Sequence, residues 1–168
     1  AAKCLSRPEE VDDAIAEARR QVDGQTGPFL EALLGAGQER FGIAWTQKLI
    51  RSARDEHWPD EDALRLLLTM PANSATWELL SAFPEAVSVD YWKRVHLFWA
   101  PGHEQDAVVG IERLIQAGRA GSALQLLASA RTTVQSELLV KTLRAAAQSA
   151  GADDIDIQSR ATMSQWAV

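Results

Sequence analysis

Residues 109–127 read VGIERLIQAGRAGSALQLL, and this stretch decides the fold class. Leucine, isoleucine and alanine recur at helical spacing on both sides of a short break at Gly118-Arg119-Ala120-Gly121. Apolar residues three or four positions apart predict a helix with one buried face. Because glycine readily ends a helix, the break predicts a tight turn between two helices, one at about 104–117 and one at about 122–130.

The composition extends this prediction to the whole chain. The sequence has 28 Ala and 19 Leu, against 10 Val and 7 Ile. Alanine and leucine lose little on entering a helix, whereas β-branched residues favour strands. We therefore expect an all-α fold. Nine helices are expected, at about 8–22, 28–34, 38–54, 60–70, 74–83, 88–100, 104–117, 122–130 and 133–150.

The joints between these helices are short. In particular, Gly35-Ala36-Gly37 is expected to end the second helix, and Pro101-Gly102 the sixth. Short joints make consecutive helices antiparallel neighbours. The sequence therefore predicts an array of antiparallel helical hairpins, similar to a solenoid, in a single domain over residues 1–168. Residues 151–168 are expected to form a polar C-terminal tail or a short docking helix.

The net charge and the cysteine content indicate which classes of partner and which cellular compartment to expect. The net charge is −6 with no basic stripe, which weighs against a phosphate backbone as partner. Clustering of Arg51, Arg54, Lys93 and Arg94 on one surface would restore a nucleic-acid-binding helical repeat as an alternative. The single cysteine, Cys4, and the lack of a long apolar run predict a cytoplasmic chain that does not enter membranes.

The motifs of common catalytic sites are absent from the sequence. Neither a Gly-rich phosphate loop nor a nucleophile elbow occurs, and the three histidines (His57, His96 and His103) do not form a zinc motif. We therefore expect no catalytic residue, no cofactor and no metal. The alternative is an enzyme of an unfamiliar all-α type, in which His96 or His103 would act with a nearby acid.

Six tryptophans are the unusual feature of the composition. Trp92 and Trp99 are seven positions apart and would share one face of a helix. With Tyr91 and His96 they form a candidate interaction face, because tryptophan and tyrosine are favoured anchors of protein interfaces. The other interpretation is that the tryptophans wedge between neighbouring helices, where a large aromatic ring buries the most area.

Residues 109–127 are similar to tetratricopeptide-like and related α-solenoid units: one helix ends in Ala-Gly-Arg and the next opens with Ala-Leu. Upstream, WELL at 77–80 and YWKRV at 91–95 resemble the helical-repeat regions of large bacterial multidomain proteins. Some such regions are thought to act as sensors in defence-type nucleoside triphosphatases. The resemblance carries over no catalytic residue. The stacked-hairpin pattern and the absence of a catalytic constellation predict a non-catalytic helical scaffold, expected to be part of a larger protein, that binds another protein or a neighbouring domain of its own chain.

Overall fold

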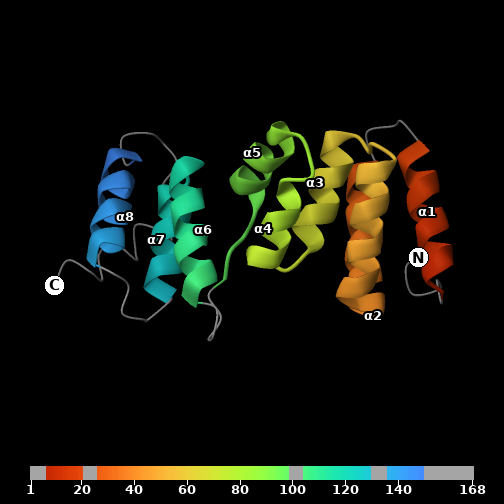
Figure 1. Ribbon diagram of the computed structural model, residues 1–168, viewed down its shortest axis with the longest axis horizontal. Coiled ribbons are helices and arrows are strands. Elements are labelled where there is room, and N and C mark those ends of the chain that lie inside the picture. Colours follow the sequence, from red (N-terminus) through yellow and green to blue (C-terminus); the bar gives the residue numbers. More distant parts are fainter. Residues whose placement is uncertain (1–6, 21–25, 99–103, 130–135, 150–168) are drawn as a thin grey trace. The chain divides into compact units, whose positions relative to one another are not determined.

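The structure, a computed structural model, describes residues 7–20, 26–98, 104–129 and 136–149. In these ranges it is all-α and contains no strand, as the sequence predicts (Figure 1). Eight helices are present there. They are α1 (Pro8–Arg20), α2 (Thr26–Asp55), α3 (Asp60–Thr69), α4 (Ser74–Leu80), α5 (Glu85–Arg94), α6 (Glu104–Gln116), α7 (Ala120–Ser129) and α8 (Ser136–Ser149). Within the described ranges, no helix is both long enough and apolar enough to cross a lipid bilayer.

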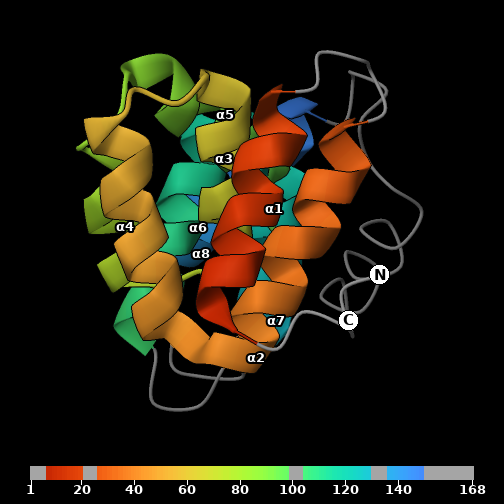
Figure 2. The ribbon, with the colours of Figure 1, turned by 90° about the vertical axis from the view of Figure 1, so that its right-hand side faces the viewer.

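The helices belong to two compact units, which are described separately. Unit 1 comprises Ala1–Pro71 and Ala75–Tyr91, and unit 2 comprises Ala72–Ser74 and Trp92–Val168. In unit 1, α1 packs on α2 and α2 packs on α3; Figure 2 shows α1 running alongside α2. The expected apolar stripe of α1 is confirmed at three positions, since Val11, Ile15 and Ala18 are buried.

The second and third expected helices form the single element α2, so the predicted stop at Gly35-Ala36-Gly37 is wrong. The interruption lies at Gly42, whose φ of 76° and ψ of −176° are not helical. Only glycine adopts this backbone conformation readily. Gly37 stays helical and serves packing instead, because the indole ring of Trp45 occupies the space where a Cβ would stand.

The joint between α6 and α7 is a helix end of the kind that glycine favours. The N–H of Gly118, at φ 76°, donates to the carbonyl oxygen of Ile115 at 3.0 Å, and the N–H of Arg119 donates to that of Leu114 at 2.8 Å. This pair of bonds satisfies two carbonyls at the end of α6. The turn is shorter than expected, because α7 already begins at Ala120.

The joint between α2 and α3 has the same pattern of bonds without a glycine. The N–H of His57 donates to the carbonyl oxygen of Arg54 at 3.2 Å, and the N–H of Trp58 donates to that of Ala53 at 2.9 Å. His57 therefore occupies the left-handed position, with a φ of 54°. Among the described residues it is the only non-glycine with a positive φ.

The sixth expected helix is shorter than predicted. It ends at Arg94, and residues 95–98 lie outside any helix. The spacing that placed Trp92 and Trp99 on one helical face therefore does not apply. Trp99 lies outside the described residues.

Unit 2 is built around α6, α7 and α8. In sequence order each of these helices packs against the next, and α6 also touches α8. Figure 1 shows the three side by side. Their shared core consists of the buried residues Ile111, Leu114, Ala120, Ala123, Leu124, Leu126, Leu127, Leu138 and Ala146. This core fixes α7 between its neighbours and thereby positions the groove described next.

Candidate functional site

A groove of about 440 Å³ follows α7 in unit 2, and we call it the α7 groove. One wall is the non-helical segment before α6, and the other comes from α6, α7 and the turn between them. The lining residues are His96, Leu97, Phe98, Leu114, Arg119, Ser122, Gln125, Leu126 and Ser129. The α7 members are three, four and seven positions apart, so they form one stripe along the helix.

Arg119 determines the shape of this groove. Its Nη1 donates to the carbonyl oxygen of Val95 at 2.6 Å and to that of Trp92 at 3.2 Å, and its Nη2 donates to Ser122 Oγ at 3.2 Å. The last carbonyls of a helix have no partner within the helix, and a cation there is favourable. Arg119 therefore satisfies the end of α5 and holds the following segment beside α7.

The charge of Arg119 is not balanced by an acid. All three of its hydrogen-bond acceptors are neutral, and burial lowers the pKa of the guanidinium below its ordinary value. In the part of the chain that the structure describes, Arg119 forms no ion pair. A partly desolvated cation without a counter-charge is an unfavourable arrangement that an anion would relieve.

The four residues of the predicted interaction face have different environments. Tyr91 is fully buried and Trp92 is nearly so, which gives both a packing role within this chain. His96 is exposed and lines the α7 groove. Trp99 lies outside the described residues. Whether this face binds a partner stays a prediction, and His96 is its one described member that solvent can reach.

The burial of Tyr91 has an electrostatic consequence. Desolvation raises the pKa of its hydroxyl to about 12, and the nearby Trp77 side chain lowers it by a smaller amount. Both residues belong to unit 1. The polar end of this tyrosine is therefore held inside unit 1 and is not offered to a ligand.

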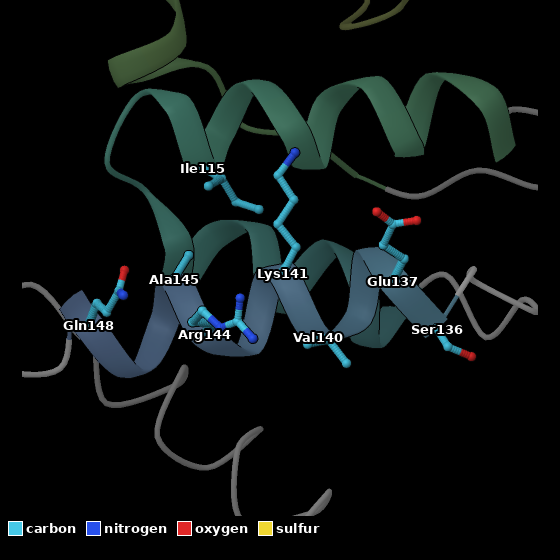
Figure 3. Close-up of a pocket in the computed structure, with 8 residues that line it drawn as sticks. All are labelled: Ile115, Ser136, Glu137, Val140, Lys141, Arg144, Ala145 and Gln148. Atoms are coloured by element: carbon cyan, nitrogen blue, oxygen red, sulfur yellow. The ribbon is translucent and has the colours of Figure 1, made fainter.

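A second hollow, of about 630 Å³, lies between α6 and α8 (Figure 3). Ile115 projects from α6 toward α8, and Lys141 extends from α8 toward α6. Lys141 Nζ donates to Glu112 Oε1 at 3.3 Å, so its charge is already paired. Val140, on the outer side of α8, is 51% exposed. This hollow offers aliphatic contacts, with a paired lysine at its edge.

The third hollow, of about 260 Å³, lies in unit 1 against α1, the second half of α2 and the joint before α3. Trp45 and Trp58 line it. The Trp45 Nε1–H donates to Asp12 Oδ1 at 2.9 Å, and Lys48 Nζ lies 3.7 Å from Asp12 Oδ2. The guanidinium carbon of Arg19 is 3.7 Å from the centroid of the Trp58 ring, a cation–π contact.

Glu56 is one of the charged residues that line this third hollow. It accepts hydrogen bonds from Ser52 Oγ at 2.7 Å and from Trp58 Nε1 at 3.0 Å, and these two bonds lower the pKa of its carboxyl. Arg19 Nη1, 3.7 Å away, acts in the same direction. Four of the five charged side chains that line this hollow are therefore paired with one another, an arrangement typical of a structural network.

The residues of the two alternative functions are distributed over unit 1, unit 2 and ranges outside the described residues. Within the described ranges no group of three or more His, Cys, Asp or Glu side chains is placed to hold a metal ion. His57 lies at the α2–α3 joint of unit 1, and His103 and Cys4 lie outside the described residues. Arg51 and Arg54 are near the end of α2 in unit 1, and Arg54 pairs with Asp55 at 2.8 Å. Lys93 and Arg94 end α5 in unit 2.

Several groove residues were missed by sequence reasoning. Ser122, Gln125 and Ser129 form a polar stripe on α7, a helix whose other positions are mostly apolar, and that periodicity could have indicated a solvated or binding face. Arg119 was assigned only to a turn. Its partners are backbone carbonyls, which every residue supplies, so no sequence pattern identifies them.

Comparisons with protein-family models, with curated proteins and with solved structures find no match to this chain.

Proposed function

We propose that this chain is a non-catalytic helical scaffold whose α7 groove binds a segment of a protein partner or of a neighbouring domain. The observation that carries the proposal is Phe98. Its side chain lines the groove and is 88% exposed, the largest exposure of any large apolar side chain among the described residues. An exposed aromatic residue beside a concave surface is a typical interface anchor.

The rest of the groove suits binding better than acid–base chemistry. The half-buried Leu97 supplies apolar surface beside the buried Leu114 and Leu126, and His96, Ser122 and Gln125 supply hydrogen-bonding groups at the rim. An apolar centre with a polar rim is the usual anatomy of an interface. Since none of the residues that line it is acidic, His96 has no carboxylate in the groove with which to form a catalytic pair.

The proposal includes the helical-hairpin array that the sequence predicts. The successive packing of α6, α7 and α8 supports it, because stacked helices bury a continuous core and leave a long face for a partner. A scaffold of this kind would also fit the sensor role that the resemblance to helical-repeat regions implies.

Phe98→Ser tests the proposal, with Phe29→Ser as the matched control. Phe29 is also an exposed phenylalanine, at 47%, but it lies on α2 in unit 1. Each purified variant is immobilised and incubated with a lysate of the source cells, and the captured proteins are quantified by mass spectrometry. Circular dichroism checks that both variants remain folded.

We expect the wild type and Phe29→Ser to capture the same protein. Phe98→Ser should capture at least about tenfold less of it, since an aromatic anchor contributes 1–2 kcal/mol or more to an interface. Equal capture by Phe98→Ser, or loss with Phe29→Ser alone, would contradict a binding role for the α7 groove.

A further inference from the structure

The strongest unexplained feature of the α7 groove is the charge at its wall. Arg119 satisfies the end of α5, for which a neutral donor would suffice. An arginine instead brings a full positive charge into a partly buried position, where burial opposes it. Proteins place an unpaired cation in such a position at a cost, and a bound anion removes that cost.

The other polar groups of the groove complement an anion as well. The Ser122 hydroxyl, which accepts from Arg119, and the Gln125 amide can both donate hydrogen bonds, and they share the α7 stripe beside Arg119. Ser129 Oγ already donates to the carbonyl oxygen of Leu126 at 2.8 Å. The His96 ring can also donate. Because none of the described residues that line the groove is acidic, a carboxylate entering it would meet a cation and hydrogen-bond donors, and none of these described residues would repel it.

The apolar residues of the groove indicate that the ligand also carries an apolar group. Phe98 is exposed, and Leu97 and Leu126 lie in the same groove. A small inorganic anion would leave this surface uncovered, whereas a peptide can place a carboxylate and an apolar side chain next to each other. In an extended peptide, side chains on one face are two positions apart, so a groove of this size can accept both kinds.

We propose that the α7 groove binds a peptide segment in which acidic side chains stand beside apolar ones, with a carboxylate against Arg119 and an apolar side chain against Phe98. This inference rests on the proposed function, since it names the partner chemistry of the same groove. It adds a preference for negative charge, which the scaffold proposal does not require.

Two probe peptides distinguish the contribution of charge to binding from the contribution of apolar contact. One is an acetylated and amidated peptide with the repeat Leu-Ser-Glu-Ser, in which leucine and glutamate two positions apart share one face, and the other has glutamine in place of glutamate. Each is titrated into the full chain at low ionic strength, and NMR follows the Arg119 side-chain N–H and the Phe98 amide. The glutamate peptide should bind at least about fivefold more tightly, because only it brings a counter-charge to Arg119.

Gln125 allows the charge of the groove to be changed without touching the Arg119 bonds. Gln125→Glu should weaken binding of the glutamate peptide by about fivefold or more, and Gln125→Lys should strengthen it. Neither variant should change binding of the glutamine peptide by more than about twofold. Gln47→Glu, on the exposed side of α2 in unit 1, has the same net charge as Gln125→Glu and should bind like the wild type.

The outcomes distinguish this inference from the function on which it rests. Equal binding of both peptides, with shifts at Phe98 and indifference to Gln125→Glu, would overturn the preference for acidic segments and leave the groove as a binding site. Binding of the glutamate peptide without shifts at Arg119 or Phe98, or no binding at all, would overturn the inference as well. The scaffold proposal would then depend on the Phe98→Ser experiment alone.

Discussion

Arg19 in unit 1 and Arg119 in unit 2 are both partly buried arginines, but their surroundings differ. Arg19 lies over the Trp58 ring and 3.7 Å from the carboxylates of Glu56 and Asp62. Arg119 contacts two backbone carbonyls and one hydroxyl. The first charge is balanced by acidic side chains of its own unit. The charge of Arg119 has no acidic partner among the described residues, so a ligand could balance it.

This difference separates the two hollows that the arginines line. In the unit 1 hollow, Asp12 and Glu56 already hold Lys48 and Arg19, so a ligand would have to break existing pairs. In the α7 groove a ligand carboxylate would break none. The hollow that is richer in charged residues is therefore the poorer candidate site of the two, because four of its five charged side chains already pair with each other.

The largest effect expected from this comparison is on stability. Arg119→Ala should lower the free energy of unfolding by about 3 kcal/mol, because it leaves carbonyls at the end of α5 without a donor. Arg19→Ala should cost about 1–2 kcal/mol, since it removes a cation–π contact and long ion pairs. Urea denaturation followed by circular dichroism measures both.

Arg113→Ala is the control for this first prediction. Arg113 is exposed on α6, and its Nη1 donates a hydrogen bond to Gln116 Oε1 within the same helix. Its removal should change the free energy of unfolding by less than about 0.5 kcal/mol. If Arg19→Ala proved as costly as Arg119→Ala or more so, the ion pairs of unit 1, and not the α5 cap, would be the stronger of the two arrangements.

Local periodicity was sufficient to predict most of the helices. The bounds of α1, α3 and α6 follow from apolar spacing and from first turns rich in acidic residues, such as Asp60, Glu61 and Asp62. These features act within a few residues of chain, so they are visible in the sequence. The errors at Gly37 and after Arg94 both come from side chains farther along the chain, eight positions away in the first case and 24 or more in the second.

At Gly37 the deciding partner is the Trp45 ring, which needs a residue without a side chain beneath it. After Arg94 it is Arg119, which satisfies the last carbonyls of α5 and lets the helix end without a proline or a glycine. The α7 groove depends on this second contact. The sequence therefore does not predict the position of this groove, although one of its lining residues, His96, belongs to the predicted interaction face.

The second prediction concerns Tyr91, whose hydroxyl is buried in unit 1. Since Tyr91 is the only tyrosine, the absorbance of tyrosinate reports on it alone. We expect a pKa of about 12 in the folded chain, against an ordinary value of 10.0. Because the folded state holds the proton more tightly, this stability is present below pH 10 and is lost as the pH rises toward 12.

The loss between these two pH values should be about 2 kcal/mol in the free energy of unfolding. Tyr91→Phe should remove this dependence on pH, which makes it the control. A tyrosinate that forms with a pKa near 10 in the folded chain would mean that the hydroxyl is hydrated. The polar groups of unit 1 would then be accessible to solvent, as those of the α7 groove are, and the difference between the two units would be smaller.

The smallest effect is expected at the two helix joints, which have the same hydrogen bonds and different residues. His57→Gly should raise the free energy of unfolding by about 1 kcal/mol, because glycine adopts the positive φ of this position without strain. Gly118→Ala should lower it by a similar amount. Thermal denaturation of the two variants measures both changes.

His57→Ala is the control, since alanine keeps the strained backbone and should leave stability within a few tenths of a kcal/mol. If His57→Gly did not stabilise the chain, or if His57→Ala destabilised it, the imidazole would be making a contribution that offsets the strain. The residue stands between Glu56 and Trp58, both of which line the unit 1 hollow. Such a result would show that the α2–α3 joint is held by side-chain chemistry, whereas the α6–α7 joint needs only the conformational freedom of Gly118.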